Sequence, residues 1–413
     1  MNPTRLTAAE TAARLGVKPE TLYAYVSRGL LGRERGPSGS SFDPLEVERF
    51  AASRRRGADR SPVQLKDGRP IGGPLMTIDT EVALIEDDEL YYRGRPVADL
   101  VGRYRFEAVC HWVWRGGLDD AVRFRPLPDA VERVIAVFAA LPPETALDDR
   151  IRIAVPVIAG ADPLREDRDP QSVAHRAGAM MITLAAALAG GPEQTTVAGC
   201  LAAALTAPDS AIDHDQLVGL LDTALVLLID HDLAVSTLAA RAAASARANP
   251  YAVVGSALGA LDSGLHGRAS VSAYRMLAAV ANGTPATEVI AATIAAGVGG
   301  VPGFGHRIYT AVDPRAELIF ARLAELSRRG VLPDACPALA AAEELVAVLR
   351  VHSGGFGNVD LALAALALAF GMPAEAGSVI FAIARIGGWI AHALDEYRQP
   401  ALRLRPIGRY VGP

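Results

Sequence analysis

Apolar residues recur every three or four positions through most of the chain after residue 106, which is the spacing of a helix face packed on a core. This pattern predicts helices over residues 106–115, 128–140, 171–189, 195–206, 215–228, 231–248, 251–265, 269–281, 286–297, 314–328, 338–350, 360–371 and 375–395. Strand-like alternation is weak and confined to Thr77–Leu84 and Leu90–Val97, where we expect a short strand or hairpin around an acidic turn. The body is therefore predicted to be mainly α-helical.

The N-terminal segment has helix signals of its own. A capping-box pattern at Thr7 predicts a helix over Ala8–Leu15, and a proline in the first turn predicts a second helix over Pro19–Ser27. Glycine and serine dominate Arg33–Ser41, and an Asp-Pro pair then opens a third helix over Pro44–Phe50. Two short helices joined by a glycine-containing turn predict a helix-turn-helix, with the Gly/Ser segment as a wing.

Residues 1–56 resemble the winged helix-turn-helix of the MerR/excisionase type, which implies contact with DNA, and residues 57–67 are predicted to form a linker. A docking or oligomerisation module is the alternative. The chain has a net charge of −5, which gives no general attraction to nucleic acid. Residues 1–60 nevertheless hold eleven Lys or Arg against seven Asp or Glu, a balance of +4 that leaves −9 on the remainder. Charge therefore keeps both interpretations open.

Composition sets the class of protein. A chain of 413 residues, 51% hydrophobic and 21% charged, suits two or three folded domains and not a disordered segment. Its three cysteines are far apart and lack metal-ligand spacing, so we expect no metal site and a reduced, cytoplasmic setting. The start has no apolar signal core, and the apolar stretches are interrupted before the roughly 18 residues that would suggest a membrane span. We expect no membrane association.

The most informative stretch for chemistry is Val301–Arg315. Gly303 and Gly305 precede His306, and glycines let the backbone approach a ligand because no Cβ blocks it. The following Asp-Pro pair disfavours helix before Arg315. An imidazole that can polarise a carbonyl and a guanidinium that can bind a carboxylate are thus presented by one loop. A glycine turn with an incidental histidine is the alternative.

Other positions are unusual for a packed helical protein, although each has a structural explanation when taken singly. His231 lies between two aspartates at a helix boundary, with Ser236 nearby, and a capping aspartate would account for it. His266 follows the end of a helix, and Asp360 precedes ten apolar residues as an N-cap would. Arg385 interrupts an apolar run, where a buried cation needs a partner. Arginines at 403, 405 and 409 would alone be a solvated tail.

Together these stretches resemble the motifs of the citrate synthase family, in order and at compatible spacing over residues 68–413. The matching segments are Asp230–Thr237, Leu265–Gly267, Val301–Arg315, Asn358–Asp360, Arg385 with Trp389–His392, and Arg405-Pro406 with Tyr410. The resemblance implies condensation of acetyl-CoA with oxaloacetate to citrate. A base removes a proton from the thioester methyl, the enolate attacks the ketone, and the citryl thioester is hydrolysed.

Carried over from the family, Asp360 is the base, His266 donates to the enolate oxygen and His306 polarises the ketone. The oxaloacetate carboxylates are bound by Arg315, Arg385 and Arg405, and Arg405 reaches across a homodimer to the partner's site. His231 adds a substrate contact, and Ser236 orients His266. The backbone at Val301, Pro302, Gly303 and Gly305 meets the CoA adenine. The resemblance implies no permanently bound cofactor, only acyl-CoA as co-substrate.

The family fold implies a large helical domain of residues 68–267 and 374–413 with a small one, 268–373, inserted. His266 and Asp360 belong to different domains, so closure must bring them together. The chain departs from the family motifs at Arg268, Ser270 and Ala234, and it has Thr310 where the CoA loop often has a basic residue. Two alternatives stay open: a 2-methylcitrate synthase that uses propionyl-CoA, and a ligand-sensing DNA-binding regulator with a degenerate enzyme body.

Overall fold

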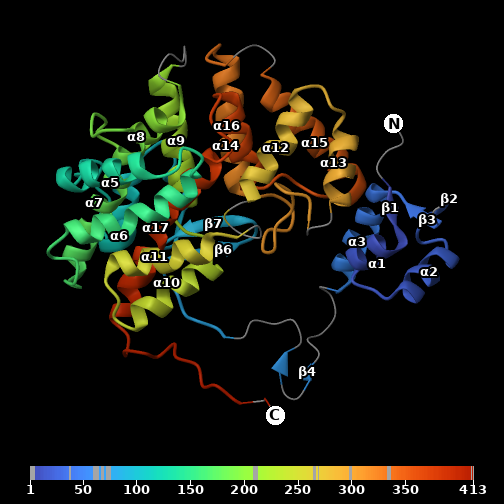
Figure 1. Cartoon of the computed structure of the whole chain (residues 1–413), viewed down its shortest axis with the longest axis horizontal. Helices are drawn as coiled ribbons and strands as arrows, with labels where there is room; N and C mark the ends of the chain where they lie inside the picture. The colour runs from blue at the N-terminus through green and yellow to red at the C-terminus, as the bar shows by residue number, and fades with distance from the viewer. Residues whose placement is uncertain are drawn as a thin grey trace.

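The computed structural model describes residues 5–36, 39–58, 65–66, 69–70, 76–207, 213–263, 267, 269–296, 300–332, 336–410 and 412. Within these residues the body is mainly helical, as predicted (Figure 1). Its helices are α4 (Phe106–Arg115), α5 (Pro128–Ala140), α6 (Leu147–Ala161), α7 (Pro170–Leu188), α8 (Val197–Leu205), α9 (His214–Leu228), α10 (Val235–Ser245), α11 (Pro250–Leu261), α12 (Ala269–Ala281), α13 (Ala286–Ala295), α14 (Pro314–Arg328), α15 (Pro337–Ser353), α16 (Val359–Ala369) and α17 (Ala376–Tyr397).

The body is organised around α17, which contacts α4, α6, α7, α9, α10, α11, α12 and α16 (Figure 1). By length and composition this helix is apolar enough to cross a membrane, but its apolar window is entirely buried in the protein. Two consecutive glycines let a neighbouring segment approach it. A Cβ at Gly388 would lie 2.3 Å from the carbonyl oxygen of Ile229, a distance that no side chain tolerates. The turn after α9 therefore packs directly on the α17 backbone.

The N-terminal module consists of α1 (Ala8–Leu15), α2 (Pro19–Ser27), α3 (Pro44–Ala58) and the antiparallel sheet β1 (Leu6–Thr7), β3 (Gly39–Phe42) and β2 (Glu34–Gly36). The predicted capping box at Thr7 is present, with Glu10 Oε2 accepting from the Thr7 amide at 2.7 Å. Leu6, Leu22 and Phe42 form its buried centre. Through α3 the module packs against α13 and α15, beside the body in Figure 1.

The predicted hairpin around the acidic turn is present, but its first strand begins later than the alternation at Thr77 suggests. Pairing starts at β6 (Ala83–Glu86), which is antiparallel to β7 (Glu89–Tyr92). They are followed by β8 (Arg95–Pro96) and a short 3₁₀ turn, η1 (Val97–Asp99). The acidic turn is correct. Asp87 and Asp88 have φ of 51° and 60°, a conformation that aspartate tolerates better than most residues and that suits a two-residue hairpin.

Most predicted helix bounds agree with the structure to within a few residues, and three helices depart further from prediction. The third N-terminal helix continues to Ala58 instead of ending at Phe50, because no helix breaker follows. The helix predicted from residue 231 starts only at Val235, since Asp232 adopts a left-handed φ of 52°. Helix α6 was missed, because Pro156 lies inside it and masks an inward face of helical period. The short pair β4 (Leu65–Lys66) and β5 (Arg69–Pro70) lies in and just beyond the predicted linker.

Candidate active site

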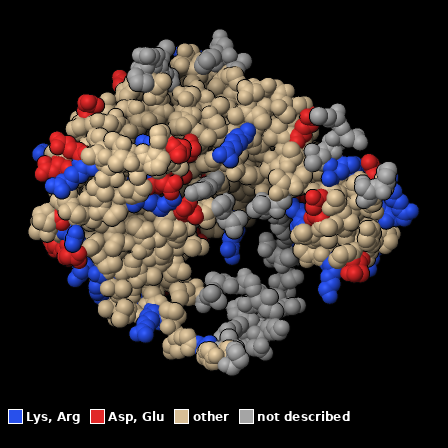
Figure 2. Space-filling view, in the orientation of Figure 1, with Lys and Arg blue, Asp and Glu red and all other residues tan. Residues whose placement is uncertain are grey.

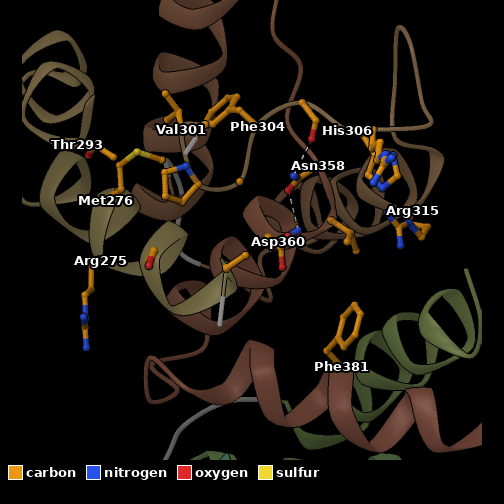
Figure 3. A pocket seen from close by; sticks show the side chains of 18 of the residues that line it. Arg275, Met276, Thr293, Val301, Phe304, His306, Arg315, Asn358, Asp360 and Phe381 are labelled. Atoms are coloured by element: carbon orange, nitrogen blue, oxygen red, sulfur yellow. Dashed lines mark hydrogen bonds between the residues drawn. The ribbon is translucent and has the colours of Figure 1, made fainter. Parts of the chain in front are cut away.

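A cavity of about 1530 Å³ opens between helices α12, α13, α16 and α17 and the loop before α14 (Figure 3). Its lining includes His231, His306, Arg315, Asp360 and Arg385. These five residues are separated by up to 154 positions in the sequence, and the fold brings all of them to one cavity. The predicted loop residues Val301, Pro302, Gly303 and Gly305 line it as well.

The glycine loop is tied to the segment that carries Asp360. The Asn358 amide donates to the Gly303 carbonyl at 2.9 Å, and the Asn358 Nδ2 donates to the Gly305 carbonyl at 2.9 Å. Gly303 has φ of +81°, and a Cβ there would lie 3.0 Å from that of Leu361. Glycine is thus required at this position by both backbone conformation and space. The loop and the start of α16 must move as one piece.

Asp360 lies in the first turn of α16 and does not cap the helix. Asn358 is the N-cap, its Oδ1 accepting from the Asp360 amide at 3.0 Å. Figure 3 shows both side chains at the cavity. Burial raises the pKa of Asp360 from 3.8 to about 6, even though the nearby Arg315 lowers it. A half-buried carboxylate with a raised pKa is better suited to accept a proton near neutral pH than an ordinary aspartate.

The tautomer of His306 follows from its contacts. Its Nδ1 accepts backbone N–H groups from Ile308 at 2.9 Å and Tyr309 at 3.2 Å, so this nitrogen carries no proton. Burial, followed by the charge of Arg315, lowers the pKa of His306 to about 4. The ring is therefore neutral at pH 7 and carries its proton on Nε2, as a hydrogen-bond donor.

His231 packs edge-on against His306, with ring centroids 4.9 Å apart, and it is only 7% exposed. Burial lowers the pKa of His231 well below its usual value, and Arg315 and Arg385 act in the same direction. Its Nε2 is buried and has no hydrogen-bond partner among the described residues. An unpaired buried polar atom is costly, so it is available for a ligand in the cavity.

Arg315 is fixed by Asp313 through two parallel bonds, Nε to Oδ1 at 2.9 Å and Nη2 to Oδ2 at 2.8 Å. Asp313 also accepts the backbone amides of Arg315, at 3.1 Å, and Val359, at 3.0 Å. One carboxylate thus caps α14, aims the guanidinium and fixes the residue before Asp360. This ion pair, with Asp313 fully buried, links the cavity-lining guanidinium of Arg315 to the segment that carries Asp360.

Arg385 is buried on α17 and contributes the second cation. Its Nε donates to the Leu228 carbonyl at 2.9 Å, and its guanidinium carbon lies 4.5 Å from the centre of the Phe381 ring. Burial lowers the pKa of Arg385 to about 10, which leaves it charged at pH 7. The structural ion pair considered above is not found among the described residues, and Nη2 has no partner there. The Arg385 guanidinium can therefore bind an anion in the cavity.

Comparison with known proteins agrees with this arrangement. A family model described as "Citrate synthase, C-terminal domain" matches residues 74–409. The chain belongs to the citrate synthase family. The match begins after the N-terminal module and includes every residue named above as lining the cavity.

Two family members illustrate the range of relatives. The citrate synthase of Haloferax volcanii is 29% identical over 374 residues, which cover 82% of this chain and 94% of the relative. The 2-methylcitrate synthase of Mycobacterium tuberculosis strain H37Rv is 27% identical over 348 residues, covering 79% and 86%. Sequence similarity therefore extends to enzymes of both names.

Solved citrate synthases share the fold. That of Thermotoga maritima superposes with a TM-score of 0.64 at 25% identity, covering 82% of this chain and 94% of that one. That of Thermoplasma acidophilum, solved as a ternary complex with carboxymethyl coenzyme A and oxaloacetate, gives 0.67 at 22% identity with the same coverages. The second similarity concerns the fold alone.

The remaining motif residues, and the departures from the motifs, differ in where they lie. His266 and Arg268 are outside the described residues. Ser236 is buried in the first turn of α10 and does not line the cavity. Arg405 is exposed in the C-terminal tail, away from the cavity of its own chain. Of the departures, Ala234 lines the cavity and Ser270 is buried 3.3 Å from Ser378.

Sequence reasoning missed three positioning residues. Asp313 was read only as part of an Asp-Pro helix boundary, and Asn358 only as a motif letter. Tyr92 was assigned only to the strand-like segment Leu90–Val97, yet its buried hydroxyl lies 3.1 Å from the Val226 and Leu227 carbonyls and 3.3 Å from the Asp230 amide. An Asp two residues before an Arg at a helix start was the available signal for Asp313. Tyr92 gave no local signal, because its partners are more than 130 residues away.

Proposed function

We propose that this protein condenses a short-chain acyl-CoA, acetyl-CoA in the first place, with oxaloacetate and hydrolyses the resulting thioester to citrate and free CoA. The observation that carries the proposal is the pairing, in one cavity, of a half-buried carboxylate of raised pKa at Asp360 with a neutral Nε2–H donor at His306. Few other reactions need a base for a weak carbon acid beside a donor for a ketone.

In the proposed reaction, Asp360 takes a proton from the carbon next to the thioester carbonyl. The new enolate carbon attacks the ketone carbon of oxaloacetate, and the ketone oxygen takes up the Nε2 proton of His306. Water then cleaves the thioester and releases CoA as a thiol. The role of His266 as donor to the enolate oxygen rests on the motif, and by analogy with oxyanion donors its loss is expected to cost about 100-fold or more in turnover.

Oxaloacetate carries two carboxylates, and Arg315 and Arg385 are the proposed ligands from the same chain. The charge of Arg315 is already paired with Asp313, so these residues leave one uncompensated cation for a dianion. A third arginine is therefore needed. Arg405 fits this role if the exposed tail reaches the cavity of a partner subunit, as the family motif implies.

The cavity residues divide between two proposed domains, 68–267 with 374–413 and 268–373. His231 and Arg385 belong to the first, whereas His306, Arg315 and Asp360 belong to the second. Closure of one domain on the other would bring the substrate-binding and proton-transfer groups together and exclude water. The CoA moiety is proposed to lie along Val301–Gly305.

For residues 1–56 we propose a winged helix-turn-helix-type module that serves for docking. Its helix α3 already packs on α13 and α15, and the face shown in Figure 2 presents both acidic and basic side chains. Such a mixed surface does not favour the phosphate contacts that dominate DNA binding. The regulator alternative thus lacks support, and a cytoplasmic location is proposed for the enzyme.

The test is release of free CoA thiol that depends on oxaloacetate, run with acetyl-CoA and propionyl-CoA in parallel. Turnover with either donor is expected in the wild type and loss of turnover in Asp360→Asn. The matched control is Asp222→Asn, at a half-buried carboxylate of raised pKa outside the cavity, and this variant is expected to stay active. One methylene discriminates by only about 1–3 kcal/mol, so the ratio of the two rates decides between the citrate and 2-methylcitrate activities. No release with either donor would contradict the proposal.

A further inference from the structure

A row of polar side chains runs through the body behind the cavity and ends at the C-terminal tail. It consists of Arg403, Glu396, Arg241, His392 and Asp230. Four of the five are at most 2% exposed. Arg403 binds Glu396 through two bonds, of 2.7 and 2.6 Å, and the other contacts along the row measure 3.1, 3.0 and 3.0 Å. None of the five lines the cavity, so the proposed reaction does not account for them.

The chemistry of the row fixes the state of its histidine. A guanidinium only donates, so the His392 Nδ1 that faces Arg241 must accept. The remaining ring proton is then on Nε2, where it donates to Asp230 Oδ2. With a neutral imidazole, two arginines balance two carboxylates and the row has no net charge. Each member has a defined donor and acceptor direction from end to end.

One end of the row holds the turn that carries His231. Asp230 directly precedes His231, and its carboxylate is fully buried against α17. The missing side chain at Gly388 makes this approach possible, since a Cβ there would lie 2.6 Å from Asp230 Oδ1. Displacement of Asp230 would therefore move the imidazole that lines the cavity.

The other end holds the tail. Arg403 is two residues before Arg405, and the tail is also anchored where the Leu402 amide donates to the Ser245 carbonyl at 2.8 Å. Leu402 adopts a left-handed φ of 60°, and the Leu404 amide donates to Ser245 Oγ at 3.4 Å, so the tail is held at two points on α10. The direction in which residue 405 leaves the body thus depends on the contact between Arg403 and Glu396.

We propose that Glu396 is a positioning residue for oxaloacetate binding, which sets the tail through Arg403 and sets the His231 turn through Arg241, His392 and Asp230. The inference rests on the proposed function, with Arg405 completing the partner's site. Both ends of the row would then serve the same ligand, one in each subunit. A row of buried ions adds little net stability relative to well-packed apolar residues, which favours a role in geometry over one in stability.

The first test replaces Arg403, whose side chain is 31% exposed and can be removed without opening the core. In Arg403→Ala we expect the KM for oxaloacetate to rise about 2- to 30-fold, the range for couplings through such networks, with the KM for acyl-CoA unchanged. Arg403→Lys keeps the charge but not the two-pronged guanidinium, so its KM for oxaloacetate should lie between those of wild type and Arg403→Ala. The matched control is Arg398→Ala, an arginine on the same helix end that is 66% exposed. An Arg403→Ala enzyme with the kinetics of Arg398→Ala would overturn the inference.

The second test uses Glu396→Gln. Because both ends act through this carboxylate, adding Arg403→Ala to Glu396→Gln should raise the KM for oxaloacetate no further. Nitrogen-15 spectra should show the His392 Nε2–H signal shifted in Glu396→Gln but not in Arg398→Ala. Additive effects of the two substitutions on the KM for oxaloacetate, or an unshifted His392 Nε2–H signal, would contradict coupling through the row. If Glu396→Gln does not fold, the Arg403 series alone decides. A wild type without turnover would refute the proposed function instead, and the same variants would then be compared by calorimetric oxaloacetate binding, where equal affinities refute the inference.

Discussion

Replacing Asp360 by Asn should abolish turnover and at the same time stabilise the fold at neutral pH. Burial raises the pKa of this carboxyl from 3.8 to about 6. The folded protein therefore holds the proton more tightly than the unfolded chain does. Above pH 6 both states are ionised, so the folded state bears the full penalty of a buried charge; below pH 3.8 both are protonated and the penalty disappears.

The magnitude follows from the two pKa values. Their difference corresponds to about 3 kcal/mol at roughly 1.4 kcal/mol per pKa unit. Asparagine has nearly the same shape and no charge, so Asp360→Asn should raise the free energy of unfolding by about 3 kcal/mol at pH 7 and by only about 0.5 kcal/mol at pH 4. Any cost of burying the amide is the same at both pH values and cancels in the comparison.

Urea unfolding of wild type and variant at pH 7, 6, 5 and 4, at one protein concentration, measures this difference. Asp222→Asn is the matched control. Burial raises the pKa of Asp222 to about 7, so the stability of Asp222→Asn relative to wild type should also grow as the pH rises, whereas its turnover should be unchanged. An Asp360→Asn gain that is equal at pH 7 and pH 4, or a loss at pH 7, would refute the claim that the cavity desolvates this carboxyl.

Four further outcomes are expected. The value of kcat/KM for oxaloacetate should fall about tenfold between pH 7 and pH 5 as Asp360 is protonated, and a profile level to pH 4.5 would contradict this assignment. Asp313→Asn should lower the free energy of unfolding by about 3–5 kcal/mol, because Arg315 keeps a buried charge without a counter-ion, and it should raise the KM for oxaloacetate; an unchanged urea midpoint would exclude the ion pair as a support. Co-expression of Arg405→Ala with Asp360→Asn chains should restore roughly a quarter of wild-type turnover, because mixed dimers contain one complete site, whereas an arginine acting in its own chain would restore none. Gly303→Ala should raise the KM for acyl-CoA more than that for oxaloacetate, since the φ of +81° at Gly303 and its close neighbours leave no room for a Cβ. Equal effects on both KM values would contradict the proposal that this loop binds CoA.

The helical body could be predicted because each long helix offers several turns over which apolar periodicity averages out local exceptions. Helix α6 shows the limit. Ile151, Ala154, Val155 and Ile158 are buried at helical spacing, but Pro156 between them is a breaker in most contexts. Only the packing of neighbouring helices makes it tolerable. Likewise, the strand before the acidic turn was misplaced because its pairing depends on the residues opposite and not on its own alternation.

The site was predictable as a set of residues and not as a set of contacts. The sequence motifs pointed to His306, Arg315 and Asp360. Nothing in their spacing shows that His306 Nδ1 accepts hydrogen bonds from two backbone amides. That contact decides which nitrogen carries the proton and thus whether the ring can donate into the cavity. The row from Asp230 to Arg403 was equally out of reach, because its members are up to 173 positions apart and each is explained locally by something else.

Asp360 illustrates the difference between predicting that a residue belongs to the site and predicting its contacts. A carboxylate at the start of an apolar helix is usually an N-cap, bonded to backbone amides and held at a low pKa. Here the helix begins at Val359, two residues earlier than a cap at Asp360 would place it, so Asn358 caps it and Asp360 lines the cavity. A shift of two positions in the helix start thus determines whether this group is a structural cap or is free to act as the proposed base. Helix boundaries are uncertain by one or two residues on sequence grounds, so the function of such a residue depends on the feature that sequence determines least.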